Sequence, residues 1–509
     1  MSRMPMPIRT FLRFVLLMLA LFEARNLQCD DRGISITVDW KKVERISQTK
    51  ATLQVVVNPP LRRGSTIHDS AWESLRKLGA DYVRFVPWYP YPRLGVAELE
   101  PPADGKTSWD FSLIDPLTMD FFQSTSGHPV MINFSTIPQW MYKTSGPVPY
   151  PVDPNEVTWN YGQGTEFRDP SGKEIADYYA RVASWYTRGG FTDEFGHRHQ
   201  SHHHHKIDYW EILNEPEYEH ALGAETYTKL YDAISASVRQ ISPDTKFVGM
   251  SLAEPMKSPT FFEYFLNPQN HRPGVSLDMI SYHFYAVPTA DQTSEIQQYT
   301  FFEQADKFLV AVDFIESIRK RLSPETKTDV NETGCILPED IGQGLPGADA
   351  SPIPSSYWNL CGAMFAYLYA GLARQGIDIV GSSQLVGYPT QFPSVTMLDW
   401  KTGQPNARYW VLKLLIDNFQ PQDRIVETKS STPFVFAQGF ITQKGTSKLL
   451  LINKRNRDFE LTVPGTAGAT LQWVDETTGS NPPLTSRLNG GKITLHGLSV
   501  AVITLDSGK

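Results

Sequence analysis

The chain has 509 residues, which is enough for two or three average domains or for one large α/β barrel with an appendage. Its formal net charge is −8, which leaves no basic surplus for phosphates and makes nucleic acid an unsuitable partner. Aromatic residues make up 12% of the chain, a share that suits a site that stacks against flat, uncharged ligand faces.

The N-terminal segment has the layout of an export signal. Arginines at its start are followed by an apolar run at residues 14–22 and by the small residue Ala24. The run is too short to span a bilayer as a mature helix. We therefore expect residues 1–28 to be a signal peptide, no membrane span in the mature chain, and a secreted or periplasmic (extracytoplasmic) location. Because Glu23 disturbs the cleavage pattern, the cleavage point is left open and a retained hydrophobic anchor is the alternative.

Cysteine usage is low. Cys29, Cys335 and Cys361 are too few for a disulfide-stapled scaffold, so the fold must rest on its core. A bridge between Cys335 and Cys361 is compatible with the sequence, and the sequence alone does not decide whether it forms.

Residues 51–419 alternate short apolar runs with longer amphipathic segments. The apolar runs are rich in β-branched residues and nearly continuous, as strands covered on both faces should be. The intervening segments have helical spacing and short joints. Eight such runs occur in order, at residues 53–60, 81–90, 129–135, 206–216, 245–254, 277–286, 327–335 and 378–388. Eight strand and helix units in a row predict an α/β fold, a (β/α)8 TIM barrel.

The pattern changes at residues 420–509. Strand-like segments there are separated by Gly, Pro, Asn and Lys turns and have no helical period. This pattern predicts a C-terminal β-sandwich appended to the barrel. Residues 29–50 hold an isolated strand-like stretch before the barrel, and we expect it to join the sandwich.

Two features around the fourth predicted strand are candidates for a functional site. Four histidines, 202–205, precede the strand, and Asn214-Glu215-Pro216 ends it. Active sites of barrels lie at the carboxyl ends of the strands, so Glu215 is on the catalytic side and the histidines are not. Contiguous histidines also lack the spacing of a built metal site, so we interpret them as a solvated loop and expect no metal and no cofactor.

A second carboxylate completes the candidate site. Glu332 ends the seventh predicted strand, so it should face Glu215 across the barrel mouth. Two such carboxyls are what glycoside hydrolysis requires, one protonated to serve the leaving oxygen and one ionised to attack the anomeric carbon. The alternative is that both are only members of buried ion pairs.

These residues resemble a known family. The stretch "WEILNEPE", the strand-seven glutamate and "LDMISYHFY" are similar to the clan A retaining glycosidases, and most of all to glycoside hydrolase family 39, the family of β-xylosidases and α-L-iduronidases. The resemblance runs from about Ala80 to Phe419 in element order. It implies that Glu215 is the acid/base, Glu332 the nucleophile, and Asn214 a ligand of the sugar 2-hydroxyl.

Further positions are candidates for substrate binding. Arg84 is expected to hold Glu332 ionised, although a plain structural ion pair is the alternative. His283 and Tyr285 are two apart on one strand and so share a face. Three tryptophans are candidate sugar platforms, each equally suited to the core: Trp88, Trp140 and Trp400. Glu211, four residues before Glu215, is interpreted as a structural group inside the barrel.

Departures from the family bear on the substrate. The iduronidases have a lysine where this chain has Tyr285, and a histidine where it has Val86. Loss of a cation opposite a sugar carboxylate would cost several kcal/mol, which favours a neutral sugar such as a β-xyloside. The sequence thus predicts a secreted retaining glycosidase whose partner is a carbohydrate. An α-L-iduronidase-like or other clan A exo-glycosidase remains the alternative, as does a carbohydrate-binding barrel without turnover.

Overall fold

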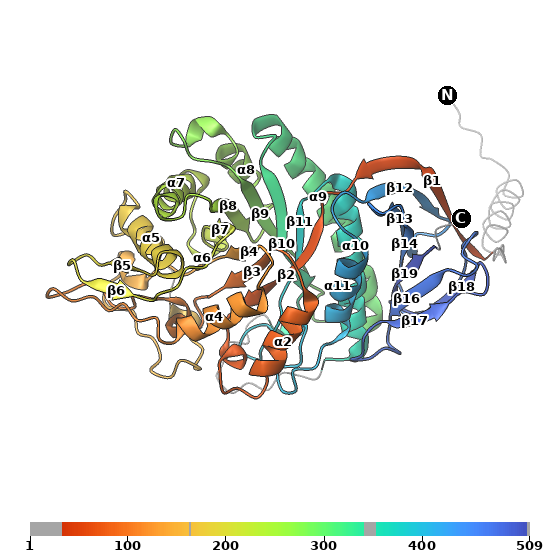
Figure 1. Ribbon diagram of the computed structural model, residues 1–509, viewed down its shortest axis with the longest axis horizontal. Helices are drawn as coiled ribbons and strands as arrows, with labels where there is room; N and C mark the ends of the chain where they lie inside the picture. Colours follow the sequence, from red (N-terminus) through yellow and green to blue (C-terminus); the bar gives the residue numbers. More distant parts are fainter. Residues whose placement is uncertain (1–32, 162–163, 341–352, 506–509) are drawn as a thin grey trace, which may run out of the picture.

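The computed structural model describes residues 33–161, 164–340 and 353–505, so the expected signal peptide at 1–28 lies outside the described residues. Two parts are visible in Figure 1, a barrel with its surrounding helices and a β-sheet domain to one side of it. Helices α10 (Ser355–Gln375) and α11 (Ala407–Asn418) contact strands of the sheet domain and so join the two parts.

The barrel is closed by eight strands, each parallel to its neighbours. In the order of the chain they are β2 (Lys50–Val56), β3 (Val83–Val86), β4 (Val130–Ile132), β7 (Tyr209–Glu211), β8 (Lys246–Leu252), β9 (Met279–Ala286), β10 (Lys327–Cys335) and β11 (Ile379–Ser382). Seven of them fall within the runs that the sequence marked as strands, and β2 overlaps its run but begins three residues earlier, at Lys50. The predicted (β/α)8 fold class is confirmed.

Helices cover the outside of the barrel. Besides α10 and α11, the helices around the barrel that exceed one turn are α2 (His68–Leu78), α4 (Ile114–Ser124), α5 (Lys173–Thr187), α7 (Ala224–Ile241), α8 (Pro259–Phe265) and α9 (Ser294–Leu322). Helix α2 illustrates why they form: its buried residues Ala71, Trp72, Leu75 and Leu78 make one apolar stripe. It ends at Gly79, whose φ of 65° is a conformation that glycine adopts without steric cost. Two single-turn helices, α3 (Pro92–Gly95) and α6 (Pro216–Glu219), lie in loops after β3 and β7.

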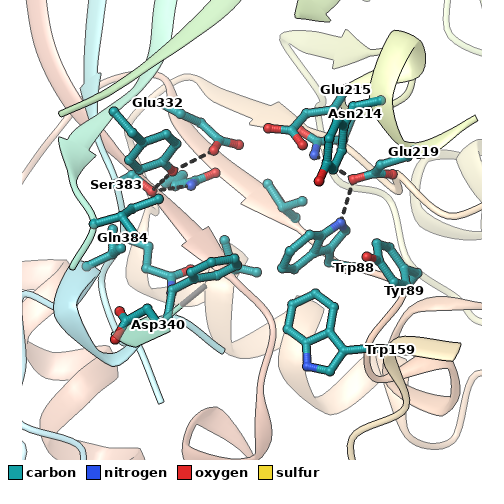
Figure 2. Close-up of a pocket in the computed structure, with 18 of the residues that line it drawn as sticks. Trp88, Tyr89, Trp159, Asn214, Glu215, Glu219, Glu332, Asp340, Ser383 and Gln384 are labelled. Atoms are coloured by element: carbon teal, nitrogen blue, oxygen red, sulfur yellow. Dashed lines mark hydrogen bonds between the residues drawn. The ribbon is translucent and has the colours of Figure 1, made fainter. Parts of the chain in front are cut away.

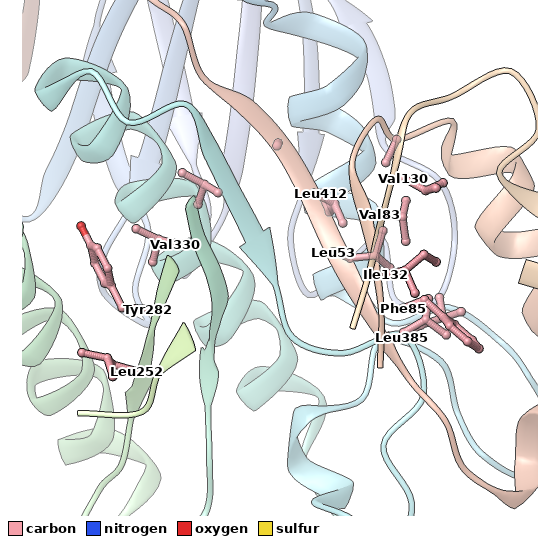
Figure 3. Packing of buried hydrophobic residues seen from close by; sticks show 14 of the residues in the cluster. Leu53, Val83, Phe85, Val130, Ile132, Leu252, Tyr282, Val330, Leu385 and Leu412 are labelled. Carbon is pink, nitrogen blue, oxygen red and sulfur yellow. The ribbon is translucent and has the colours of Figure 1, made fainter. Parts of the chain in front are cut away.

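Alternation along the strands separates two kinds of environment. In β3, Val83 and Phe85 belong to the apolar core between strands and helices, where Figure 3 shows them beside Val130 and Ile132 of β4. Arg84, between them in sequence, points to the opposite face, into the barrel. A fully buried side chain such as Phe85 contributes about 1.5–3 kcal/mol, so the outer core holds the strands in register around a polar interior.

The C-terminal domain is a sheet of nine strands that curls over its own core. It contains β12 (Arg424–Ser430), β13 (Val435–Ile441), β14 (Ser447–Asn453), β15 (Phe459–Thr462), β16 (Thr470–Val474), β17 (Leu484–Arg487), β18 (Lys492–Leu495) and β19 (Val500–Thr504). Its ninth strand is β1 (Ile34–Ile46), which precedes the barrel in sequence. Because β1 pairs antiparallel with β12 and parallel with β15, it joins the two layers expected of a sandwich into one continuous sheet.

A disulfide links Cys335, at the end of β10, to Cys361 in α10, with 6.0 Å between the Cα atoms. The sequence had left this bridge open. Within the described ranges, no helix has both the length and the apolar character needed to cross a bilayer.

Candidate active site

Glu215 and Glu332 both lie at the carboxyl-terminal mouth of the barrel. Glu332 lies within β10, in register with His283 of β9, whereas Glu215 follows the end of β7 and opens α6. The backbone N–H of Glu215 donates to the carbonyl of Ser251 at 3.0 Å, which ties it to β8. Glu215 has φ 42° and ψ 51°, a left-handed conformation that costs a non-glycine residue about 1–3 kcal/mol. Such strain concentrates at functional sites, and the carboxyl of this residue lies 2.9 Å from Nδ1 of His283.

The two carboxyls are close together. Oxygen atoms of Glu215 and Glu332 lie within 4.8 Å of each other, together with a ring nitrogen of His283. Carboxyl groups about 5–5.5 Å apart are typical of retaining glycosidases, whereas inverting enzymes need about 6.5–9.5 Å to admit a water molecule. The spacing therefore suits direct attack by one carboxylate on a carbon held between the two.

Arg84 fixes Glu332 from below. Its Nη1 lies 2.5 Å from Oε1 of Glu332, and its Nε lies 2.5 Å from Oε2 of Glu211. The same guanidinium donates to three further oxygens, those of Gln54, Asn214 and Ser251. Arg84 is fully buried, and the adjoining carboxylates raise its pKa even though burial opposes the charge. The expected Arg84–Glu332 pair is present, as one part of a larger network.

Three neighbours keep Glu332 ionised. Burial alone would raise the pKa of its carboxyl, but the charges of His283 and Arg84 and a hydrogen bond from Tyr285 lower it below the ordinary 4.5. The Tyr285 hydroxyl donates to Oε2 of Glu332 at 2.7 Å and lies 2.6 Å from Oγ of Ser383. Glu332 is therefore prepared as a carboxylate that can attack an electrophilic carbon.

His283 lies between the two carboxyls. Its Nδ1 is 2.9 Å from Oε1 of Glu215, and its Nε2 is 3.5 Å from Oε1 of Glu332. Burial alone would lower the pKa of the imidazole, but the charge of Glu332 and the hydrogen bond to Glu215 raise it above 6.5. Nε2 is also 3.0 Å from Oγ of Ser251, so the ring is held by Ser251 on one side and by Glu215 on the other, with its charge, when protonated, next to both carboxyls.

Glu211 lies deeper in the barrel. Its carboxyl accepts hydrogen bonds from four side chains: Arg84, Asn133, Ser281 and Asn331. A buried carboxylate with this many donors is well compensated for its lost hydration. The contacts give Glu211 a structural role beneath the site.

A cavity of about 700 Å³ opens above the carboxylates. Figure 2 shows Glu332 and Ser383 on one side of it and Asn214, Glu215 and Glu219 on the other. Its aromatic wall contains Trp88, Tyr89, Trp159 and Phe392. Trp88 contacts Trp159 edge to face, with ring centroids 5.3 Å apart, and lies nearly parallel to Phe392 at 6.3 Å. Asn214 and Tyr285 line the cavity, whereas Arg84 and His283 lie beneath it.

Two of the candidate tryptophan platforms lie away from this cavity. Trp140 and Trp400 are not among the described residues that line the cavity. Trp140 donates to the Glu98 carbonyl at 2.8 Å and has the guanidinium of Arg168 over its ring, while Trp400 packs against the main core. Of the three candidates, Trp88 lines the cavity and the other two pack elsewhere.

Several cavity residues were missed in the sequence. Trp159 and Phe392 come from long loops after β4 and β11, where no periodicity marks them. Phe392 also has a φ of 52°, a backbone conformation that sequence does not reveal for a bulky residue. Glu219 carried a signal that was overlooked, because it stands four residues after Glu215 and a short helix would place the two on one face.

Glu215, His283 and Glu332 are close enough together to suggest a metal site. The contacts argue against one, because the guanidinium of Arg84 already neutralises Glu332 and His283 has a raised pKa. A further cation would meet two positive groups where it needs free ligands. The donor set therefore fits an acid and nucleophile pair better than a metal centre.

The histidine run enters β7 from the opposite end of the barrel, as expected, but it is not freely solvated. His203 Nε2 lies 3.1 Å from Oδ2 of Asp115, and His205 stacks on Phe122 with centroids 4.2 Å apart. His202 and His204 are exposed. The interpretation as a fully solvated loop is wrong for the two alternate residues, which pack because extended chain points them inward.

No protein-family model and no curated protein sequence matches the chain. Solved structures match over nearly the whole chain. They include a family GH51 arabinofuranosidase from Xanthomonas axonopodis pv. citri (12% identity, 93% of this chain and 100% of that chain, TM-score 0.64). A GH30 endoxylanase from Clostridium papyrosolvens has 13% identity over 93% and 100%, with a TM-score of 0.55. A GH51 α-L-arabinofuranosidase from Thermotoga petrophila has 15% identity over 93% and 100%, with a TM-score of 0.58. The fold of this chain, a TIM barrel with an appended β domain, is shared with these enzymes.

Proposed function

We propose that the protein is a retaining glycoside hydrolase of clan A. The observation that carries the proposal is the pair Glu215 and Glu332, with oxygens within 4.8 Å of each other at the catalytic mouth of the barrel. The fold shared with arabinofuranosidases and an endoxylanase supports it. The polar network around Glu332 supports the division of roles, because it lowers the pKa of that carboxyl.

The geometry suggests a double displacement. An oxygen of Glu332 attacks the anomeric carbon as the bond to the leaving oxygen breaks, and Glu215 gives that oxygen its proton. Glu215 then takes a proton from water, whose oxygen displaces Glu332 from the same carbon with restored configuration. Arg84, His283 and Tyr285 hold Glu332 through both steps, and Asn214 is placed to meet a sugar hydroxyl.

Within the clan we propose a family 39-like enzyme acting on a neutral sugar, with a β-xyloside as the leading candidate. No lysine, arginine or histidine occurs among the described residues that line the cavity. The two internal segments outside the described ranges, 162–163 and 341–352, contain none of these residues either. A uronic acid would therefore meet Glu215 and Asp340 without a free cation to pair with. Tyr285, where a lysine would serve an acidic sugar, is already bonded to Glu332.

We also propose that the protein is exported. The Cys335–Cys361 bridge supports this, because disulfides persist mainly in oxidising compartments. The arginines and apolar run at residues 1–28 support it from the sequence. N-terminal sequencing of protein recovered outside the cell should begin within a few residues of Cys29; an intact first segment would contradict the proposed cleavage.

The test of the activity is a panel of nitrophenyl glycosides, read for rate and for the anomer first released. We expect turnover of a neutral pentoside or hexoside, no detectable turnover of uronides, and product of retained configuration by NMR. Glu332→Gln serves as the matched inactive control. Inverted product would refute the retaining mechanism, and binding of sugar without any turnover would leave a carbohydrate-binding barrel.

A further inference from the structure

A third carboxyl, Glu219, belongs to the wall of the cavity. It lies one helical turn after Glu215, and its backbone N–H donates to the Glu215 carbonyl at 2.7 Å. Figure 2 shows its side chain beside Asn214 and Trp88, on the Glu215 side of the cavity. The two-carboxylate reaction proposed above does not use it.

One oxygen of Glu219 holds two other cavity residues. Its Oε1 accepts a hydrogen bond from Nε1 of Trp88 at 2.7 Å and another from Nδ2 of Asn214 at 2.9 Å. The indole can act only as a donor, so Oε1 must accept. Without Glu219, both N–H groups would lose their acceptor in a largely buried place.

The contact with Glu219 fixes the amide of Asn214. Its Oδ1 accepts from Nη2 of Arg84 at 2.7 Å, and because a guanidinium only donates, the amide orientation follows. Nδ2 is thereby turned to Glu219, which takes one of its two N–H groups. The other N–H has no acceptor among the described residues and can donate to a ligand in the cavity that Asn214 lines.

The surroundings of Glu219 favour its neutral form. Burial and the nearby charge of Glu215 raise the pKa of its carboxyl well above the ordinary 4.5, although the bonds from Asn214 and Trp88 oppose this. Its second oxygen, Oε2, is enclosed and has no hydrogen-bond partner among the described residues. A neutral acid keeps the acceptor that the two N–H groups need and adds no third negative charge to the site.

We propose that Glu219 is a positioning residue that holds the Asn214 amide and the Trp88 indole against the bound sugar and exchanges no proton during the reaction. The proposal rests on the proposed glycosidase function. Two substitutions distinguish a positioning residue from a third catalytic carboxylate. Glu219→Gln keeps the acceptor oxygen but cannot exchange a proton, whereas Glu219→Leu removes the acceptor at similar size.

The first test measures kcat/KM on a series of monodeoxy glycosides. The hydroxyl that Asn214 binds is identified by two results. Its removal from the substrate should lower kcat/KM of the wild type at least about tenfold, and the same removal should make no difference in Asn214→Ala. In Glu219→Leu the penalty for that hydroxyl should shrink to within about twofold, less than one neutral hydrogen bond is worth, with the other penalties unchanged. Glu219→Gln should keep the wild-type pattern. A full penalty in Glu219→Leu would overturn the positioning role.

The second test is the pH profile. Glu219→Gln should keep kcat/KM within about threefold of wild type, with both limbs of the profile unmoved, because a positioning group exchanges no proton with the substrate and the amide keeps the acceptor oxygen. A loss of a hundredfold, or a displaced limb, would make Glu219 a proton-exchanging group and refute the proposal. This variant is isosteric, so the test holds even where Glu219→Leu folds poorly.

Glu217 provides the matched control. It lies on the same turn of α6 and also has an enclosed, unpartnered oxygen, but it is not among the described residues that line the cavity. Glu217→Leu should leave the deoxy pattern unchanged. Calorimetric binding of the free monosaccharide distinguishes failure of the positioning role from failure of the proposed glycosidase function. If no form turns over substrate but only Glu219→Leu binds the sugar more weakly, the glycosidase is refuted and the positioning role stands. If no form binds the sugar, both are refuted.

Discussion

Arg84→Met should be the most damaging single change beneath the site. The guanidinium is fully buried and makes ion pairs with Glu211 and Glu332, both at 2.5 Å. Methionine replaces the aliphatic part of the side chain but not the guanidinium, so the change removes the charge and leaves two enclosed carboxyls without their cation. Removing one partner of a buried pair costs about 3–5 kcal/mol, and we expect the free energy of unfolding to fall by that amount at neutral pH.

The loss of stability in Arg84→Met should depend on pH, and the pKa of Glu332 determines the direction. The folded-state pKa of Glu332 is lowered, so its stabilising contribution is complete above the ordinary 4.5 and is lost as pH falls through the lower folded value. The stability gap between wild type and Arg84→Met should therefore narrow in acid. Denaturant unfolding between neutral pH and pH 3 measures it, and the acid limb of kcat/KM should move to higher pH in the variant. A variant as stable as wild type at neutral pH, or an unmoved acid limb, would refute the reasoning.

Three further outcomes follow from the same contacts. Tyr285→Phe removes a donor to ionised Glu332, so kcat/KM should fall by about 10- to 100-fold, as expected for a hydrogen bond to a charged group, while a normal melting temperature would show that the fold is intact. Asn331, in a glycosylation sequon, is 2% exposed and should carry no glycan in mass mapping of protein made in a glycosylating cell. Replacing histidines 202–205 by Ser and Gly should keep kcat/KM within about threefold but lower the unfolding free energy by about 1 kcal/mol, since stacking and an ion pair are lost; a hundredfold loss of activity would show that the loop acts on the site.

The barrel was predictable because parallel strands buried on both faces leave a strong signal. Each strand appears as a short, β-branched apolar run, and the helices between them have apolar stripes such as that of α2. The positions of Glu215 and Glu332 followed from strand order alone, since the carboxyl ends of all eight strands meet at one mouth. The sequence led us to expect the strand in residues 29–50 to join the C-terminal domain, but its pairing with both β12 and β15 could not be predicted, because long-range strand pairing leaves no local pattern in the sequence.

The walls of the cavity were less predictable than its floor. Polar residues on strands, such as Arg84 and Tyr285, are placed by the alternation of the strand, whereas Trp159 and Phe392 depend on the path of long loops. Aromatic residues serve equally well in core and site, so the sequence could not decide between the two for Trp140. Whether a tryptophan lies in the site or in the core depends on how its loop packs in the folded protein, which the local sequence does not show.

The two glutamates can be separated by the leaving group they serve. Glu332→Gln should abolish turnover of every glycoside, because no leaving group removes the need for a nucleophile. Glu215→Ala should fail on alkyl glycosides, whose departing oxygen needs a proton, yet it should still form the covalent intermediate from a nitrophenyl substrate. That intermediate should accumulate as a burst, because water has lost its base, and added azide should release it as a glycosyl azide of retained configuration. If the alanine variant at 215 were dead on nitrophenyl substrates while the glutamine variant at 332 formed the azide product, the two roles would be exchanged.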